Sequence, residues 1–349
     1  MQRLRGLYIL NEDAYRKIYG PSERQAIEQH VEMVGPPQTR LSIAENKGLL
    51  KDVEVIFSGW GAPIFDEKFL DAAPKLRVLF YGAGTVGYCT TPAVWDRGIL
   101  VTTAVAANSI PVAEYTLANI LLSLKRARRL ANQTRQLRRF PKPSTAPGSY
   151  GATIGLISLG ATARALLKML SLLELRVTAY DPFIDTADAA KLGAELVSLD
   201  ELFSQSDVVS LHTPSLPETR GMITGQHLAS MKQGATFINT ARGEIVRQNE
   251  LIEVATNRPD LEFVLDVTYP EPPEPNSPLY TLQNVLLTPH IAGSVGRECN
   301  RLGQYMVEEL RRFVRGEPLR WSVIPEATAQ SNRRLVVQLP RKPRSVEMA

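Results

Sequence analysis

The stretch that most constrains the fold lies near the middle of the chain and reads ATIGLISLGATARALLKML, followed by LRVTAYDPF. An apolar run leads into a turn of small residues and a helical pattern, and a second apolar run ends in Asp181. Such a unit lets backbone approach a pyrophosphate at a helix N-terminus while the acid accepts ribose hydroxyls. The positions of a G-x-G-x-x-G motif hold Ser158, Gly160 and Ala163. The pattern predicts a dinucleotide site with two glycines replaced by small residues, and a turn in a doubly wound sheet without a dinucleotide is the alternative.

Asp181 also favours one nicotinamide cofactor over the other. Its carboxylate would repel the 2′-phosphate of NADP, and no arginine follows it in DPFIDTAD. The predicted cofactor is therefore NAD (NADH).

Strand-like apolar runs alternate with helix-like segments on both sides of this unit, which is typical of βαβ units and parallel sheets. The runs lie at 53–60, 76–84, 99–104, 152–158, 175–181, 207–214, 236–241, 263–268 and 284–290. Long helices are predicted over 109–131 and 296–315. With 349 residues, the chain is long enough for two domains. We expect an α/β fold of two doubly wound Rossmann-like domains with an active-site cleft between them.

Composition excludes several other classes. Apolar residues make up 44% of the chain and charged residues 22%, which is typical of globular proteins. No apolar run is long enough to span a membrane, and the apolar run near the start is too short for a signal peptide. The two cysteines have no metal-ligand spacing and make no disulfide framework. We expect a cytoplasmic protein with no metal and no membrane contact.

The net charge of +4 is concentrated at the C-terminus. The last 20 residues hold five Lys or Arg and one acid, which gives +5 − 1 = +4. Because the rest of the chain is balanced, we expect no nucleic-acid partner. The segment 329–349 is predicted to be a basic, poorly ordered tail.

Three polar side chains follow successive strand-like runs. Arg242 follows TFINTA, Glu271 follows FVLDVT, and His290 ends NVLLTPH. Arginine can hold a carboxylate in two hydrogen bonds, histidine can exchange a proton with a C2 oxygen, and a neighbouring carboxylate favours the protonated imidazole. Each residue alone could be an ordinary surface or capping group. Together, after a dinucleotide-like turn, they predict a catalytic set for a small 2-keto or 2-hydroxy acid.

Several segments resemble, in order, the D-2-hydroxyacid dehydrogenase family, which includes phosphoglycerate dehydrogenases and glyoxylate/hydroxypyruvate reductases. They are NSIPVAEYTLANILL, TIGLISLGATAR, SDVVSLHTPSLPETRGMI, MKQGATFINTARGEIV, LDVTYPEPP and LLTPHIAGS. The resemblance implies that Arg242 orients the substrate, His290 is the acid/base and Glu271 tunes it. It also implies a discontinuous substrate domain (1–107 and 296–328), an NAD-binding domain (108–295) and a homodimer through the latter.

The same resemblance extends to binding residues. For the cofactor they are Ser158, Leu159, Gly160, Ala161, Thr162, Asp181, His212, Thr213, Pro214, Thr240, Ala241, Asp266 and Gly293. For the substrate they are Trp60, Gly61, Ala83, Gly84, Asn108 and Arg242. The loop YGAGTVGYC departs from the family pattern, because Tyr81 and Tyr88 add bulk and the usual acids are missing.

The predicted function is an NAD-dependent D-2-hydroxyacid dehydrogenase. The alternative is an NAD(H)-sensing, corepressor-like binding protein of the same fold with little turnover. The replaced motif glycines and the basic tail favour this alternative, whereas the joint presence of Arg242, Glu271 and His290 favours the enzyme.

Overall fold

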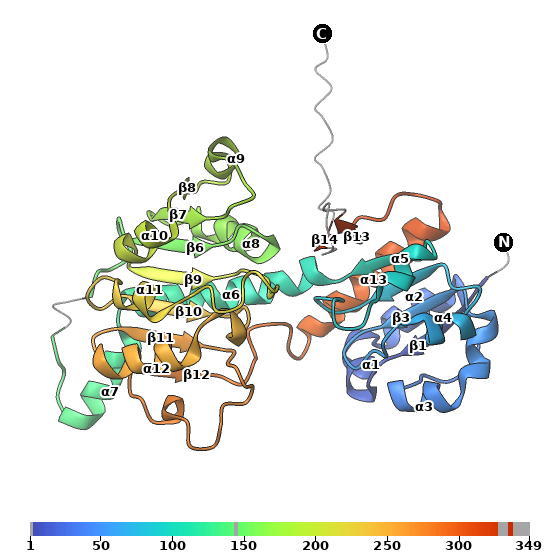
Figure 1. Cartoon of the computed structure of the whole chain (residues 1–349), viewed down its shortest axis with the longest axis horizontal. Coiled ribbons are helices and arrows are strands. Elements are labelled where there is room, and N and C mark those ends of the chain that lie inside the picture. Colours follow the sequence, from blue (N-terminus) through green and yellow to red (C-terminus); the bar gives the residue numbers. More distant parts are fainter. Residues whose placement is uncertain (1–2, 143–145, 327–333, 338–349) are drawn as a thin grey trace, which may run out of the picture. The chain divides into compact units, whose positions relative to one another are not determined.

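The computed structural model describes residues 3–142, 146–326 and 334–337. The chain divides into two compact units. Unit 1 comprises Met1–Asn108 and Ser294–Ala349, and unit 2 comprises Ser109–Gly293. Each is an α/β unit built on a sheet that has seven strands among the described residues (Figure 1). The predicted fold class is confirmed, and the cleft expected between the domains stays a prediction.

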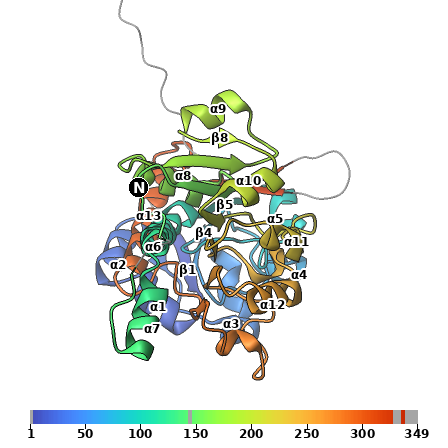
Figure 2. The same ribbon diagram turned by 90° about the vertical axis from the view of Figure 1, so that its left-hand side faces the viewer.

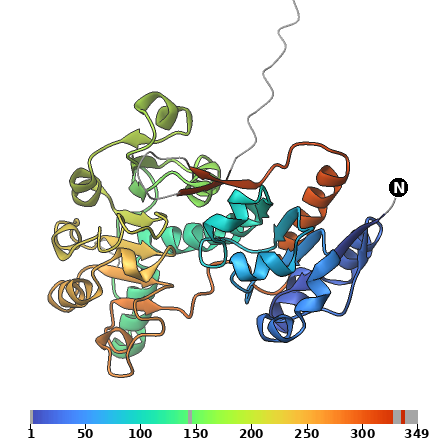
Figure 3. The same ribbon diagram turned by 45° about the vertical axis from the view of Figure 1, so that its right-hand side comes forward.

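The sheet of unit 1 has the order β14-β13-β5-β4-β3-β1-β2, and the five strands from β5 to β2 are parallel. These parallel strands are β1 (Leu4–Ile9), β2 (Val31–Met33), β3 (Val55–Ser58), β4 (Val78–Tyr81) and β5 (Leu100–Thr103). The last two, β13 (Ser322–Glu326) and β14 (Arg334–Val337), form an antiparallel hairpin beside β5, drawn in red in Figure 3.

Helices cover both faces of this sheet, as apolar strands buried on both sides require. On one face lie α1 (Glu12–Ile18), α2 (Pro21–Glu28) and α13 (Glu298–Val314). On the other lie α3 (Arg40–Glu45), η1 (Lys47–Asp52), α4 (Glu67–Ala72) and α5 (Pro92–Asp96).

The sheet of unit 2 is entirely parallel, with the order β12-β11-β10-β9-β6-β7-β8. Its strands are β6 (Thr153–Ile157), β7 (Arg176–Tyr180), β8 (Glu195–Leu196), β9 (Val208–Leu211), β10 (Thr236–Asn239), β11 (Glu262–Leu265) and β12 (Val285–Leu287). The order reverses between β6 and β9, and ligands of open α/β sheets bind at the carboxyl ends of strands beside such a point.

Two helical layers also bury this sheet (Figure 2). One contains α6 (Val105–Leu124), α8 (Ala161–Leu170) and α9 (Thr186–Lys191). The other contains α10 (Leu199–Gln205), α11 (Gly225–Ala229) and α12 (Gln248–Asn257). The short helices η2 (Gly243–Ile245) and η3 (Pro278–Tyr280) lie in the connections after β10 and β11.

The long helix predicted over 109–131 is wrong in its extent. The chain forms α6 and then a second helix, α7 (Ala127–Leu137). Arg126 separates them with a positive φ of 50°, which a right-handed helix cannot contain. The first helix also starts earlier than expected, so that Pro111 lies inside it rather than in its first turn. Proline cannot donate to the carbonyl four residues earlier, that of Ala107.

The tail prediction is corrected at one place. Residues Arg334–Val337 fall in the segment expected to be poorly ordered, yet they pair with β13 as strand β14. Their sequence RLVV is apolar enough for an edge strand. The rest of 329–349 lies outside the described residues.

Among the residues that the structure describes, no helix has the length and apolar character needed to cross a bilayer. Both cysteines, Cys89 and Cys299, are buried free thiols.

Candidate active site

The turn after β6 has the shape of a pyrophosphate cradle. Ser158 takes a φ of 74°, in the left-handed region where the motif normally has glycine. Gly160 is the N-cap of α8, and a Cβ built there would meet no atom within 4 Å. Ala163 is fully buried in the core, so the third motif position needs a small side chain and alanine fits. The open space in front of a helix N-terminus fits a dinucleotide phosphate.

Asp181 fastens this turn to the end of β7. Its Oδ2 accepts a hydrogen bond from the amide of Leu159 at 2.7 Å, and its Oδ1 accepts one from the amide of Phe183 at 2.9 Å. Ala161 and Thr162 form the first turn of α8. Each carboxylate oxygen can accept a further bond, so the predicted ribose contact fits this position.

His212 follows β9, and its backbone amide donates to the carbonyl of Ile157 at the end of β6 at 2.9 Å. Its ring lies 3.0 Å from Ser210 Oγ, and burial lowers the pKa of His212 to about 4. Thr213 is also buried, and Pro214 follows it. His212 is therefore neutral near pH 7 and shapes this edge of the sheet without acting as an acid.

The Thr240–Arg242 turn follows β10 and is shaped by Asn239, which sequence analysis did not single out. The Asn239 side chain is buried, accepts from the amide of Ala241 at 3.0 Å and donates to the carbonyl of Arg242 at 3.1 Å. Thr240 Oγ1 lies 3.4 Å from Thr116 Oγ1 on α6. Arg242 itself is exposed, and among the described residues its guanidinium donates only to the carbonyl of Ala241, at 2.6 Å. Four of its five N–H groups thus stay available to a ligand.

Gly243 is a second residue that sequence analysis missed. A Cβ at this position would lie 2.0 Å from the backbone carbonyl carbon of Thr268. The turn that carries Arg242 is therefore packed directly on the backbone that follows β11. The only sequence signal for this close approach was a glycine next to a candidate functional arginine.

The structure brings Glu271 and His290 together. Glu271 Oε1 lies 2.6 Å from His290 Nδ1, and both side chains remain about half exposed, at 42% and 48%. His290 takes a φ of 54°, an uncommon conformation that is often found at functional sites. Because Nδ1 is engaged by the carboxylate, Nε2 is the ring atom left to meet a substrate.

Asp266 holds the backbone on which His290 lies. Its carboxylate is 2% exposed and accepts from the amides of Ile291 at 2.9 Å and Ala292 at 2.8 Å. It also accepts from Thr288 Oγ1 at 2.6 Å. The predicted cofactor contact of Asp266 stays a prediction, and the geometry adds a positioning role. Gly293, also predicted to contact the cofactor, is the last residue of unit 2.

Four predicted substrate residues of unit 1 follow the adjacent parallel strands β3 and β4, whereas the fifth, Asn108, lies in α6. Trp60 follows β3, and its carbonyl accepts from the amide of Asn11 after β1 at 2.9 Å. Gly61 has a φ of 83°, and a Cβ there would lie 2.0 Å from Asn11 Oδ1. The indole of Trp60 remains 36% exposed. The segments after β1 and β3 are thus held together, and the indole of Trp60 lies at their surface.

The loop after β4 carries Ala83 and Gly84. Ala83 is buried, and its amide donates to the carbonyl of Tyr81 at 2.8 Å, so this amide is not available to a ligand as predicted. The amides of Gly84, Thr85 and Val86 have no acceptor among the described residues. A Cβ at Gly84 would lie 3.9 Å from Asn108 Nδ2. Successive free amides of this kind can bind a carboxylate.

Comparison with known proteins identifies the region that carries the turn and the Arg242, Glu271 and His290 side chains. Residues 117–292 match the family described as D-isomer specific 2-hydroxyacid dehydrogenase, NAD binding domain. A D-3-phosphoglycerate dehydrogenase of Archaeoglobus fulgidus is 32% identical over 258 residues, covering 74% of this chain and 49% of that protein. A glyoxylate reductase of Korarchaeum cryptofilum is 32% identical over 305 residues, covering 83% of this chain and 89% of that protein.

Solved structures show the same architecture. A D-lactate dehydrogenase of Aquifex aeolicus, complexed with NAD and lactic acid, has a TM-score of 0.66 and 25% identity, covering 89% of this chain and 96% of that one. The chain spans about half the length of the D-3-phosphoglycerate dehydrogenases that it matches.

Proposed function

The chain belongs to the D-isomer specific 2-hydroxyacid dehydrogenase family, and from this premise we propose that it is an NAD-dependent oxidoreductase. It transfers hydride between the nicotinamide and C2 of a small 2-keto or 2-hydroxy acid. The proposal depends mainly on the 2.6 Å contact between Glu271, which follows β11, and His290, which follows the neighbouring strand β12. Arg242 follows β10, the neighbour of β11 on the other side.

Bound NADH supplies the hydride, and residues of the chain bind the substrate and deliver the proton. The free N–H groups of Arg242 hold the substrate carboxylate in a fork and fix the orientation of C2. Negative charge builds on the C2 oxygen during ketone reduction, and His290 delivers a proton to it from Nε2. Glu271 holds the ring through Nδ1 and compensates the charge of the imidazolium. The free amides of the loop after β4 are further candidates for binding a carboxylate.

NADH oxidation, followed at 340 nm with a panel of 2-keto acids, tests this proposal. The panel contains glyoxylate, pyruvate, hydroxypyruvate and bulkier acids, each with NADH or NADPH. We expect turnover with at least one acid and a preference for NADH of tenfold or more, because Asp181 repels a 2′-phosphate. Tight NADH binding without turnover of any acid would instead support the alternative.

That alternative is a dinucleotide-sensing binding protein of the same fold. It is favoured by one observation, the strained Ser158 in place of the first motif glycine. The Glu271–His290 pair has no use in a protein that only binds NAD, and so we prefer the enzyme.

We propose in addition that the protein works in the cytoplasm as a homodimer formed through unit 2. Two free thiols are typical of a reducing compartment. Helix α7 has no buried residue, and Leu137 and Phe140 at its end are 50% and 92% exposed. A second copy would cover these side chains.

Light scattering coupled to size exclusion tests the dimer. Leu137→Glu combined with Phe140→Glu should convert it to a monomer. Leu172→Glu is the matched control, because Leu172 is 86% exposed elsewhere in unit 2. A double variant that elutes with the mass of the parent dimer would show that α7 is not the interface.

A further inference from the structure

Three large apolar side chains of unit 1 are exposed on two loops that pair with each other. Trp60, Ile64 and Tyr88 are 36%, 59% and 53% exposed. The amide of Phe65 donates to the carbonyl of Cys89 at 2.7 Å, which joins the loop after β3 to the loop after β4. We call Trp60, Ile64 and Tyr88 the apolar wall.

The position of Tyr88 in this wall is fixed by Tyr81. The two phenol oxygens are hydrogen-bonded, and the rings meet edge to face with centroids 6.2 Å apart at 72°. Tyr81 is 1% exposed at the end of β4, so it is an immobile anchor. Burial raises the pKa of both phenols, which keeps them neutral. Tyr88 is therefore held in place, and the wall carries no charge of its own.

The loops that carry the wall contain no cation. Neither 58–66 nor 81–92 has a lysine or arginine, and the first of these segments ends with Asp66. In the neighbouring helix α1, Arg16 is 3.3 Å from Glu12 and Lys17 is 2.7 Å from Asp13. A phosphate group bound at the wall would find no arginine or lysine on these loops to neutralise it.

The wall adjoins the free amides of the loop after β4. Gly84, Thr85 and Val86, whose amides have no acceptor among the described residues, precede Tyr88 by only two to four positions. A carboxylate bound there would be held by the same loop that carries Tyr88, so we expect the substituent at C2 to meet this ring. The free amides predict a carboxylate at one end of the substrate, and the wall predicts an uncharged, apolar side chain at the other.

Resting on the proposed function, we infer that the substrate is a 2-keto or 2-hydroxy acid whose side chain is uncharged and bulky and packs on the apolar wall. A phosphorylated acid, which the names of many relatives suggest, is a poor substrate for this chain. Tyr81 is a positioning residue that acts through Tyr88.

Initial rates of NADH oxidation by the full chain test the inference, with phenylpyruvate, 4-methyl-2-oxopentanoate, glyoxylate and 3-phosphohydroxypyruvate as substrates. We expect kcat/KM to be at least tenfold higher for phenylpyruvate than for the phosphorylated acid. Trp60→Ala and Tyr88→Ala should each lower the phenylpyruvate-to-glyoxylate ratio of kcat/KM by tenfold or more. Tyr81→Phe should lower the same ratio less, through KM rather than kcat.

Leu41→Ala is the control, because Leu41 on α3 is 72% exposed and lies on neither of the loops that carry the wall, and it should keep the parent ratio. A parent enzyme that prefers 3-phosphohydroxypyruvate, or wall variants with an unchanged ratio, would overturn this inference and leave the proposed function intact. Absence of turnover with all four acids would overturn both.

Discussion

At the scale of single residues, the pairing of His290 with Glu271 determines which imidazole nitrogen can do chemistry. Nδ1 is held by the carboxylate at 2.6 Å, and two backbone contacts, from the His290 amide to the carbonyls of Asp266 and Thr288 at 2.9 and 3.0 Å, fix the main chain. His212, also at a strand end of this sheet, cannot substitute for it, because burial holds its pKa near 4. Of the two histidines at strand ends of this sheet, His290 is the one that is paired with a carboxylate.

His290→Asn should lower kcat by about a hundredfold or more, the usual effect of losing a positioned acid. NADH affinity should stay nearly unchanged, because the cofactor turn after β6 does not involve this side chain. Stopped-flow reduction of the preferred keto acid and NADH fluorescence titration give the two quantities. Glu271→Gln should reduce kcat less, since an amide can still hold the ring. Parent-like turnover in His290→Asn would remove the basis of the site assignment.

Ser158 has a backbone conformation that is unfavourable for any residue with a side chain. A non-glycine residue at a φ of 74° costs roughly 1–2 kcal/mol. Ser158→Gly should therefore raise the free energy of unfolding by about 1 kcal/mol, partly offset by the greater freedom of glycine in the unfolded chain. Urea unfolding measures the change, and a variant less stable than the parent would show that the serine side chain contributes more than the strain costs.

At the scale of elements, the sequence allowed the central strands to be predicted well and their connections less well. Long apolar runs such as 152–158 became β6 because a parallel strand is buried on both faces. The edge strands β2 and β8 have only three and two residues, too few for a periodic pattern. The break after α6 depends on the backbone of Arg126, which no local composition indicates.

For the candidate site, the polar residues after the strands could be predicted from the sequence, but the residues that hold their backbone could not. Arg242, Glu271 and His290 could be placed because polar residues after apolar strands gather at the carboxyl edge of a parallel sheet. The roles of Asn239 and Asp266 as backbone holders could not be predicted. They depend on which amides a buried side chain meets after folding, and these amides come from turns that differ in every sheet.

Gly243→Ala tests how closely two of these turns must approach. The added methyl group would lie 2.0 Å from the Thr268 carbonyl carbon, and backbone there cannot move away as a flexible side chain could. We expect a loss of about 1–3 kcal/mol in stability and a fall in kcat/KM of at least tenfold as Arg242 shifts. Gly48→Ala is the matched control, because a Cβ there meets no atom within 4 Å. If Gly243→Ala behaved like that control, the turns would not be in contact.

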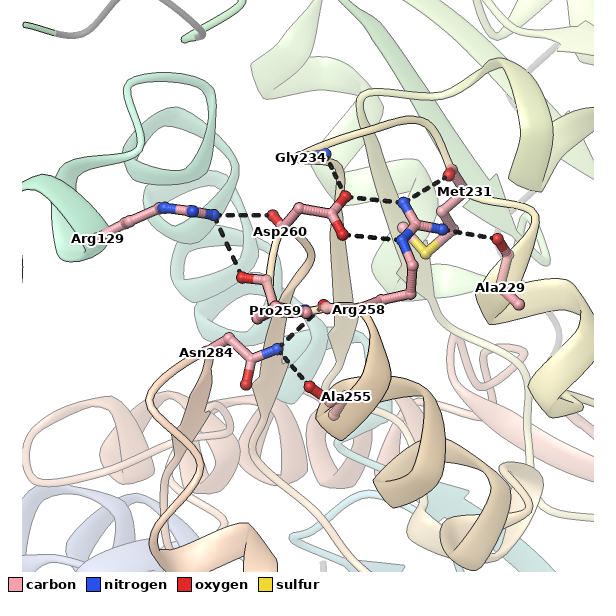
Figure 4. Close-up of polar contacts among 9 residues, drawn as sticks. All are labelled: Arg129, Ala229, Met231, Gly234, Ala255, Arg258, Pro259, Asp260 and Asn284. Carbon is pink, nitrogen blue, oxygen red and sulfur yellow. Dashed lines mark hydrogen bonds and ion pairs between the residues drawn. The ribbon is translucent and has the colours of Figure 1, made fainter.

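At the scale of the whole molecule, an ion pair stabilises unit 2 at the amino-terminal ends of its strands. Arg258 binds both oxygens of Asp260 at 2.8 Å and donates to the carbonyls of Ala229 and Met231, as Figure 4 shows. Arg129 of α7 reaches the carbonyl of Asp260 at 3.1 Å. The ion pair and the hydrogen bonds around it thus link α7, α11, α12 and the start of β11.

The hydrogen bonds from Arg258 and, with a smaller effect, from the amide of Gly234 lower the pKa of Asp260 from 3.8 to about 2. Its side chain is 26% exposed, so solvent screens the pair only in part. A depressed carboxyl pKa adds stability that is fully present above the unfolded value and is lost as pH falls through the folded value. The shift corresponds to about 2 kcal/mol at pH 7.

Asp260→Asn should therefore lower the free energy of unfolding by about 2 kcal/mol at pH 7, and by about half of this or less at pH 2.5, where the parent carboxyl begins to take up its proton. Urea unfolding of parent and variant, followed by circular dichroism at each pH, measures both differences. Asp188→Asn is the control, because Asp188 pairs with Lys191 on the surface with both side chains more than half exposed. Such exposed pairs contribute little. If parent and Asp260→Asn differed by the same free energy of unfolding at both pH values, the ionised carboxylate would not be what stabilises these strand ends. The contacts of Arg258 with the carbonyls of Ala229 and Met231 would then have to account for the stabilisation.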